Sequence, residues 1–323
     1  MSKLKVIVTR KWPSEVEAQL KDLYDVQLNE SDIPMTSDEL KHALQSADAL
    51  LPTVTDALTS EVLSVENRQT RIIGNFGVGY NHIDIDTAKA QGLVVTNTPH
   101  VLTDCTADIA MLLLLMSARR ASEGERLILQ KQWIGWKPTQ LIGQKVTGKT
   151  LGLIGFGRIA QAMAKKAHHG FGMRILFYSP SQPAQNIMDD LQATRCERVE
   201  DVLTEANFIS LHCPGGEATR HLINEQRLKL MRPSAHLINT ARGDVIDSKA
   251  LIKALKEGWI AGAGLDVFEG EPNIDTGFFE LDNVSLLPHL GSATEETRVA
   301  MGNRVLANLA AFFAGKEPND RVV

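Results

Sequence analysis

Short apolar runs alternate with amphipathic stretches along the first third of the chain. The apolar runs, which are typical of strands, are Lys5–Thr9, Asp25–Leu28, Ala47–Pro52, Arg71–Phe76 and Leu93–Asn97. Apolar residues at helical spacing fill the intervals Ser14–Leu23, Ser37–Gln45 and Ile83–Gln91. The first two of these helices begin with a serine, which can cap a helix. Alternating strands and helices predict a parallel sheet covered by helices on both faces.

A second alternating series follows a long helix and an irregular segment. The helix is predicted over Thr103–Gln130, and the segment Trp133–Gly148 has the glycine and proline content of a loop. The strands expected beyond it are Thr150–Ile154, Arg174–Tyr178, Phe208–Cys213, Ala235–Thr240, Gly262–Val267 and Val284–Leu287. Helices such as Arg158–Ala167 and Ser248–Glu257 lie between them. Six strands joined by crossovers are what a dinucleotide-binding Rossmann domain requires.

The last patterned stretch, Thr294–Phe313, predicts a helix whose apolar face has no partner within the second series. We therefore expect it to pack back on the first series, which makes the first domain discontinuous. The sequence predicts an α/β protein with one domain formed by residues 1–99 and 288–323. The dinucleotide-binding domain, residues 100–287, is inserted into it.

Composition and charge narrow the possible functions. The chain has 323 residues, a hydrophobic content of 43% and a formal net charge of -5. This charge argues against a nucleic-acid partner, which requires a basic face, so an anionic substrate must be bound by a local positive site. The start of the chain has no apolar signal-peptide core, and its most apolar run, Ile109–Met116, is too short to span a membrane. We expect a cytoplasmic protein with no membrane contact and, because Cys105, Cys196 and Cys213 match no metal-ligand spacing, no metal site.

A glycine-rich turn opens the second series. The segment TLGLIGFGRIAQAMA places Gly155, Gly157 and Ala160 in the G-x-G-x-x-A pattern, directly after a strand and at the start of a helix. Gly155 allows the tight turn, Gly157 lets the backbone approach a pyrophosphate, and Ala160 allows close packing of helix and strand. The N–H groups at the helix start, at Arg158 and Ile159, would face the negative charge. The turn predicts a dinucleotide cofactor.

The end of the next strand indicates which dinucleotide is used. Ser179 stands where an acidic residue would bind the ribose 2′-hydroxyl of NAD. Without a carboxylate there, the 2′-phosphate of NADP is not repelled, although no Arg or Lys lies nearby in the sequence to attract it. Ser179, Ser181 and Gln182 could donate hydrogen bonds to that phosphate. The sequence therefore favours NADP (as NADPH), with NAD possible.

Three ionisable residues lie at or near the ends of strands in the second series: Arg242, Glu271 and His289. Arginine holds a carboxylate with its fork and can polarise a carbonyl with its permanent charge. A protonated histidine can deliver a proton near neutral pH, and a neighbouring glutamate would favour that protonated form. Because ligands bind at the carboxyl ends of parallel strands, this set predicts hydride transfer to a 2-oxo acid.

The G-x-G-x-x-A turn, ARGDVID, GLDVFEGEP and PHLGSATEETR together resemble the D-isomer-specific 2-hydroxyacid dehydrogenase family, over nearly the whole chain. The resemblance implies a Rossmann domain inserted into a flavodoxin-like substrate domain, with Arg242, Glu271 and His289 as the catalytic residues. It also implies that Asp266, otherwise a strand-end cap, binds the nicotinamide amide. The other cofactor contacts it implies are Thr106, Cys213, Pro214 and Thr240.

In the family, backbone N–H groups of the loop Asn75–Asn81 bind the substrate carboxylate, which points to Val78 and Gly79. Consecutive amides around glycine can form an anion-binding nest, although the same loop could be a plain glycine turn.

Within the family, the chain is most similar to glyoxylate/hydroxypyruvate reductases, which reduce small 2-oxo acids to D-2-hydroxy acids. The segment WIGWKPTQLIG resembles their dimerisation loop, in which a tryptophan of the partner subunit reaches the active site. Trp136 is our candidate and Trp133 the alternative, unless both anchor the loop on their own subunit. The resemblance thus implies a homodimer, with Ser292 able to hydrogen-bond a substrate hydroxyl. Another D-2-hydroxyacid dehydrogenase, of D-lactate or phosphite type, and a cofactor-sensing scaffold are the competing interpretations.

Overall fold

The computed structural model describes residues 3–323, which form two compact units. Unit 1 consists of residues 3–102 and Ala293–Val323, and unit 2, Thr103–Ser292, is inserted between them. The sequence placed these junctions after residues 99 and 287. In the structure, residues 100–102 belong to unit 1, and unit 2 begins with helix α5 (Thr103–Ala118), which packs on its strands. Residues 288–292 belong to unit 2, where Asp266 binds the backbone of Leu290 and Gly291. His289 and Ser292 therefore belong to unit 2.

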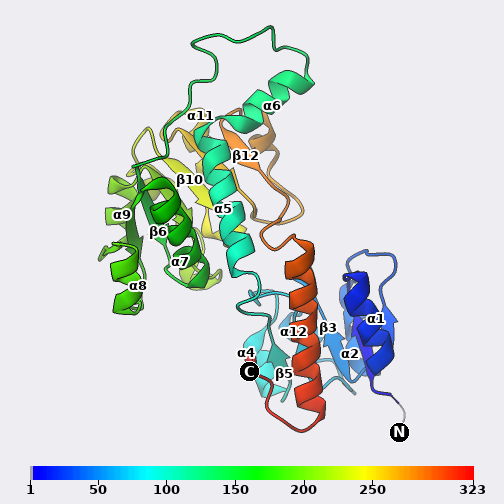
Figure 1. Cartoon of the computed structure of the whole chain (residues 1–323). Helices are drawn as coiled ribbons and strands as arrows, with labels where there is room; N and C mark the ends of the chain where they lie inside the picture. Colours follow the sequence, from blue (N-terminus) through cyan, green and yellow to red (C-terminus); the bar gives the residue numbers. More distant parts are fainter. Residues whose placement is uncertain (1–2) are drawn as a thin grey trace. The chain divides into compact units, whose positions relative to one another are not determined.

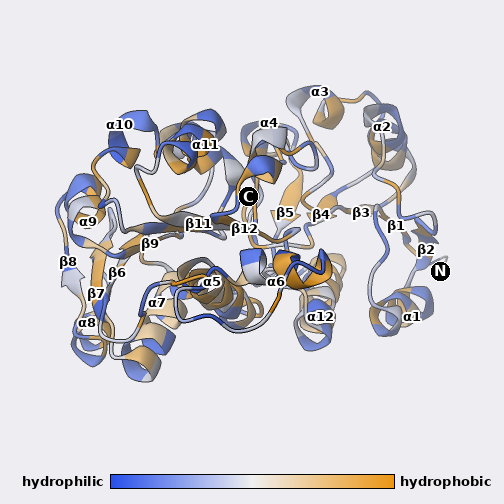
Figure 2. Cartoon of the chain, turned by 90° about the horizontal axis from the view of Figure 1, so that it is seen from above, coloured by the Kyte–Doolittle hydropathy of each residue, from blue (hydrophilic) through white to orange (hydrophobic). Residues whose placement is uncertain are grey.

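Unit 1, coloured blue, cyan and red in Figure 1, contains a five-stranded parallel sheet. Its strand order, β2-β1-β3-β4-β5, can be followed in Figure 2. The strands are β1 (Lys5–Val8), β2 (Asp25–Leu28), β3 (Ala49–Leu51), β4 (Ile72–Gly74) and β5 (Val94–Thr96). Each lies within a predicted strand. The order is that of flavodoxin-like folds, as the resemblance implied.

Helices cover both faces of this sheet. They are α1 (Ser14–Leu23), α2 (Ser37–Ser46), α3 (Ser60–Leu63), α4 (Ile85–Ala90) and α12 (Glu295–Phe313). Figure 2 shows α2, α3 and α4 on one face and α1 and α12 on the other. The predicted serine caps are wrong, because the cap lies one residue earlier in both helices. Thr36 accepts the N–H of Glu39 at the start of α2, whereas Pro13 precedes α1 without a side-chain cap. Helix α3 was not predicted, since one turn is too short to show a period.

Helix α12 packs on unit 1, which confirms the prediction made from its apolar face. Two glycines allow the close approach. A Cβ atom on Gly302 would lie 2.6 Å from a methyl group of Val16 in α1, and a Cβ atom on Gly74 of β4 would lie 2.7 Å from a methyl group of Val305. The chain thus returns to its first domain after completing the second.

Unit 2 contains a seven-stranded parallel sheet with the order β12-β11-β10-β9-β6-β7-β8. The strands are β6 (Thr150–Ile154), β7 (Arg174–Tyr178), β8 (Thr194–Arg195), β9 (Phe208–Leu211), β10 (His236–Asn239), β11 (Gly262–Leu265) and β12 (Val284–Leu286). Six of them were predicted, and their order is that of the Rossmann fold with one added strand at the β12 edge. Strand β8 was missed because two residues show no alternation.

The α-helices of unit 2 include α5 and α7 on one face of its sheet and α10 and α11 on the other (Figure 2). Besides α5 they are α6 (Ala121–Leu129), α7 (Arg158–Lys165), α8 (Gln185–Asp190), α9 (Val199–Glu205), α10 (Glu225–Leu228) and α11 (Ser248–Lys256). The chain also forms a π-helical turn over Lys166–Gly170 and 3-10 turns over Glu217–Thr219, Gly243–Val245 and Thr276–Glu280.

The single helix predicted over Thr103–Gln130 is wrong, since the structure has two helices there. Arg120 adopts a left-handed conformation with φ 53°, which ends α5 and redirects the chain into α6. The carbonyl of Ala118 accepts the N–H of Gln144 at 2.8 Å, so a later loop binds the end of α5. The apolar run Ile109–Met116 lies in α5 with four of its eight residues buried. Among the helices of residues 3–323, none is long and apolar enough to cross a membrane.

Candidate active site

The turn between β6 and α7 has the geometry that its glycines predicted. Gly155 has φ 88°, and a Cβ atom there would lie 2.7 Å from the carbonyl group of His212 and 2.8 Å from the amide nitrogen of Cys213. Both the backbone conformation and the space therefore require glycine. The close contact brings the carboxyl ends of β6 and β9 together, and Cys213 and Pro214 continue from the latter.

Gly157 precedes α7 and leaves the helix start open. It caps α7 without a side chain, and a Cβ atom on it would meet nothing within 4 Å. Within residues 3–323, the N–H groups of Arg158 and Ile159 at the start of α7 have no acceptor, while Ala160 is fully buried. A helix start with free N–H groups and room in front of it suits a pyrophosphate.

Thr240, at the end of β10, provides a second indication of a bound group. Its side chain is 9% exposed, and its hydroxyl has no hydrogen-bond partner within residues 3–323. Buried hydroxyl groups are almost always paired, so a missing partner suggests a ligand. The nearby Cys213 thiol is a poor nucleophile, because burial raises its pKa to about 11. Together with the Gly157 opening, Thr240 fits a dinucleotide bound across the carboxyl ends of these strands.

Asp266, at the end of β11, holds the loop that carries His289. Its two carboxylate oxygens accept the N–H groups of Leu290 at 2.7 Å and Gly291 at 2.8 Å. Burial raises the pKa of this carboxyl, while those two hydrogen bonds act in the opposite direction. Thr106 of α5 lies beside the loop, since a Cβ atom on Gly291 would be 3.3 Å from both Thr106 and Asp266. Asp266 thus caps the end of its strand, which is the alternative that the sequence left open, and it lies next to Thr106, a residue implied to contact the cofactor.

His289 and Glu271 form a hydrogen-bonded pair. The Nδ1 atom of His289 donates to Glu271 Oε2 at 2.9 Å, and Glu271 Oε1 accepts the N–H of Phe268 at 2.7 Å. Burial alone would raise the pKa of Glu271, but His289, Phe268 and Arg242 together lower it, so Glu271 is ionised at neutral pH. His289 has φ 56°, a conformation that costs energy in a residue other than glycine and is concentrated at functional sites.

Arg242 follows β10 and is held by its own strand end. Its carbonyl accepts from Asn239 Nδ2 at 2.8 Å, and its Nη1 donates to the carbonyl of Ala241 at 2.7 Å. A Cβ atom on Gly243 would lie 1.8 Å from the carbonyl carbon of Phe268, so only glycine lets this segment approach the loop that carries Glu271. Burial lowers the pKa of Arg242 and the charges of Glu271 and Asp244 raise it, so the guanidinium stays protonated. The structure thus groups Arg242, Glu271 and His289.

Ser179 lies at the end of β7, 5% exposed, with its hydroxyl 3.3 Å from that of Ser181. The structure also places a cation here that the neighbouring sequence lacks. Arg195 of β8 donates from Nη2 to the carbonyl of Ser179 at 2.9 Å. Sequence reasoning missed it because Arg195 comes sixteen residues later, on a strand too short to recognise.

The loop Asn75–Asn81 belongs to unit 1. Asn75 Nδ2 donates to the carbonyls of Gly77 and Gly79, both at 3.1 Å, and Asn97 Nδ2 donates to the carbonyl of Val78 at 2.8 Å. Within residues 3–323, the N–H groups of Val78 and Gly79 have no acceptor. Adjacent backbone amides without a partner, in a loop held by these side-chain bonds, are able to bind an anion.

The remaining candidates are Ser292 and the two tryptophans of the segment between α6 and β6. Ser292 directly follows Gly291 and is partly exposed. Trp136 and Trp133 lie between α6 and β6 and are 81% and 54% exposed. The three cysteines are free and partly buried, and no group of three or more potential metal-binding side chains occurs within the described residues.

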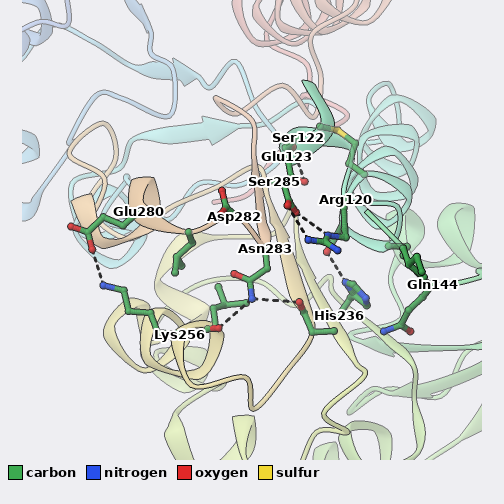
Figure 3. A pocket seen from close by; sticks show the side chains of 18 residues that line it. Arg120, Ser122, Glu123, Gln144, His236, Lys256, Glu280, Asp282, Asn283 and Ser285 are labelled. Atoms are coloured by element: carbon green, nitrogen blue, oxygen red, sulfur yellow. Dashed lines mark hydrogen bonds and ion pairs between the residues drawn. The ribbon is translucent and has the colours of Figure 1, made fainter. Parts of the chain in front are cut away.

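A hollow of about 510 Å³ lies at the amino ends of the strands of unit 2, whereas the candidate site lies at their carboxyl ends (Figure 3). It is lined by residues at the amino ends of β10, β11 and β12, and it contains none of the predicted site residues. His236 in its wall bonds Ser117 through Nδ1 at 2.7 Å, and burial lowers its pKa to about 4. His236 begins β10 whereas Thr240 follows its end, so this hollow is separate from the candidate site.

Comparison with known proteins supports this chemistry. Residues 111–291 match the family described as D-isomer specific 2-hydroxyacid dehydrogenase, NAD binding domain. A glyoxylate reductase of Thermococcus litoralis is 46% identical over 99% of this chain and 97% of its own length. A glycerate dehydrogenase of Hyphomicrobium methylovorum is 40% identical over 98% of both chains.

A solved structure shows the same fold over the whole chain. An NADPH-dependent glyoxylate/hydroxypyruvate reductase of Sinorhizobium meliloti, in complex with NADP and malonate, superposes with a TM-score of 0.85 and 32% identity. The match covers 100% of this chain and 97% of that one. These similarities confirm the resemblance seen in the motifs, and the chain belongs to the D-isomer-specific 2-hydroxyacid dehydrogenase family as a nicotinamide-dependent, glyoxylate reductase-like enzyme.

Proposed function

We propose that this enzyme reduces glyoxylate and hydroxypyruvate to the corresponding 2-hydroxy acids (a D-hydroxy acid from hydroxypyruvate), with NADPH as the preferred reductant. The observation that carries the proposal is the His289–Glu271 hydrogen bond of 2.9 Å, beside Arg242 at the carboxyl edge of a Rossmann sheet. The pair supplies an acid and the arginine supplies a carboxylate-binding cation, which are what reduction of a 2-oxo acid requires. The names of the relatives from Thermococcus litoralis and Sinorhizobium meliloti agree with this substrate class.

Each residue of the site has a defined part in the proposed reaction. The free amides of Val78 and Gly79 bind the substrate carboxylate, and Arg242 binds it as well and polarises the carbonyl. His289 donates a proton from Nε2 to the forming alkoxide, and the ionised Glu271 stabilises the protonated imidazole before this transfer. The bound nicotinamide dinucleotide supplies the hydride. Ser292 hydrogen-bonds the hydroxyl group of hydroxypyruvate.

The proposed cofactor contacts follow the carboxyl ends of the strands. The pyrophosphate lies over Gly155, Gly157, Arg158 and Ile159, and Cys213 and Pro214 form the neighbouring wall. Thr106, Thr240 and Asp266 face the nicotinamide, with the Thr240 hydroxyl as an unused donor. NADP is favoured over NAD because Ser179 and Ser181 place hydroxyls, and no carboxylate, at the ribose.

A substrate panel tests the proposed activity. With NADPH, glyoxylate and hydroxypyruvate should give a kcat/KM about tenfold or more above those of pyruvate and 2-oxoglutarate, because the site is suited to small acids. Oxidation of NADPH and NADH under steady-state conditions is the measurement. Preference for pyruvate, or oxidation of phosphite, would place the enzyme in another branch of the family. Equal rates with both reductants would contradict the cofactor preference alone.

We also propose that the enzyme is a homodimer in which Trp136 of one subunit limits the size of substrate in the other. Exposed apolar residues in one stretch of the chain support this: Ile128, Leu129, Trp133, Ile134, Trp136 and Ile142. Such a concentration of exposed apolar residues is typical of an interface.

Replacing Trp136 with Ala should raise kcat/KM for a bulky 2-oxo acid such as phenylpyruvate, relative to glyoxylate, by about tenfold. The matched control is Trp133→Ala, which should leave this ratio unchanged, and light scattering gives the mass of both variants. A monomeric wild-type enzyme, or an unchanged ratio in Trp136→Ala, would contradict the assignment.

A further inference from the structure

Arg195 ends the edge strand β8, directly beside the end of β7. Its backbone pairs with Phe177 of β7, and its Nη2 donates to the carbonyls of Ser179 at 2.9 Å and Pro180 at 3.4 Å. The guanidinium is therefore fixed against the loop that follows β7. This is the loop at which Rossmann enzymes distinguish the two nicotinamide dinucleotides.

The charge of Arg195 is not compensated by the protein. Within residues 3–323 it forms no salt bridge, and its Nε and Nη1 donate to no acceptor. Two nearby arginines behave differently, since Arg174 pairs with Glu205 at 2.9 Å and Arg198 pairs with Asp201 at 2.6 Å. An arginine anchored through one nitrogen, with other donors free, is prepared to bind an anion.

Two hydroxyl groups belong to the loop that Arg195 contacts. Ser179 Oγ lies 3.3 Å from Ser181 Oγ, and residues 179–184 (SPSQPA) contain no carboxylate. A cation, two hydroxyl donors and the absence of negative charge select a phosphate monoester over a neutral hydroxyl.

We propose that Arg195 binds the 2′-phosphate of NADP and that the hydroxyls of Ser179 and Ser181 complete this subsite. The inference rests on the proposed binding of NADP at the β6–α7 turn. It differs from that proposal by locating the decisive cation on β8, outside the loop that follows β7. Arg195 is thus a specificity-determining residue that acts on the cofactor and not on the 2-oxo acid.

Calorimetric titration with NADP+, NAD+, 2′,5′-ADP and 5′-AMP tests this assignment without relying on turnover. Arg195→Gln should weaken NADP+ and 2′,5′-ADP by about tenfold to a hundredfold, the effect of losing a charge-assisted hydrogen bond. NAD+ and 5′-AMP should change by less than about twofold, which also shows that the variant is folded. Arg195→Lys should fall between the wild type and Arg195→Gln, because it keeps the charge and loses the fork.

The matched control is Arg174→Gln at the amino end of β7. It removes the same charge from the opposite end of the strand that pairs with β8, and it should alter none of the four affinities. If the wild type prefers NADP+ and Arg195→Gln keeps that preference, the role of Arg195 is refuted and the proposed cofactor stands. If the wild type binds NAD+ as tightly as NADP+, the cofactor preference and the Arg195 assignment both fail.

Discussion

Replacing His289 with Asn should lower kcat for glyoxylate reduction by about 10²–10⁴-fold, with little change in the Kd for NADP+. His289 Nδ1 is held by Glu271 at 2.9 Å, and its Nε2 has no acceptor within residues 3–323, which leaves this atom to donate a proton. Asparagine is a better replacement than alanine because it tolerates the left-handed conformation at φ 56°. The loss therefore reports the missing acid and not a distorted loop. Steady-state kinetics and cofactor titration measure the two quantities.

Glu271→Gln is the companion variant, because it removes the charge beside the imidazole and keeps a group of the same shape. The pKa of Glu271 lies below its usual range, so the wild-type enzyme carries this charge throughout the neutral range. Without it, the pH at which reductase activity declines should move downward, since the protonated imidazole loses its stabilising partner. Wild-type activity in His289→Asn, or an unshifted pH profile in Glu271→Gln, would refute the assignment of His289 as the acid.

Replacing Ser179 with Asp should reverse the coenzyme preference, changing the ratio of kcat/KM for NADPH to that for NADH by about a hundredfold or more. The new carboxylate would repel a 2′-phosphate and accept hydrogen bonds from the ribose hydroxyls of NAD. It would also lie beside Arg195, whose Nη2 already contacts the carbonyl of residue 179, and would neutralise that cation. Kinetics with both reductants at saturating glyoxylate measure the ratio.

Ser179→Asn separates charge from size, because asparagine has nearly the volume of aspartate and no charge. It should weaken both cofactors to a similar degree and leave their ratio within about threefold of the wild type, since it adds no like-charge repulsion. If Ser179→Asp kept the preference for NADPH, the interpretation of this strand end would be wrong. If Asn shifted the ratio as much as Asp, shape and not charge would decide the preference.

Local patterns determined most of the architecture. The period of apolar residues located all five strands of unit 1, six of the seven in unit 2, and the helix α12 that returns to unit 1. Gly155 and Gly157 marked the turn between β6 and α7, where the backbone conformation and the close contact at Gly155 require glycine, so the turn proposed to bind the pyrophosphate was visible in fifteen consecutive residues. These features depend on neighbours in the chain, which is why the sequence alone specifies them.

Other features depended on residues that meet only after folding. The end of α5 depends on the left-handed conformation of Arg120 and on the hydrogen bond from the later residue Gln144 to Ala118. The spacing of apolar residues along a helix contains no information about either feature. The carboxylate of Asp266 binds the loop of His289. Asn75 and Asn97 bind carbonyls of the loop that contains Val78 and Gly79, whose own amides have no acceptor among residues 3–323.

The surroundings of Ser179 show most clearly what the sequence determined and what only the tertiary structure decided. The sequence determined that no acidic residue ends β7, and it contained no nearby cation. The tertiary structure placed Arg195 there, because a two-residue strand pairs with β7 and carries a side chain across from a position sixteen residues away. Periodicity and turn chemistry act over a few residues, whereas the charge around a binding site is set by strand pairing, which brings distant positions within hydrogen-bonding distance.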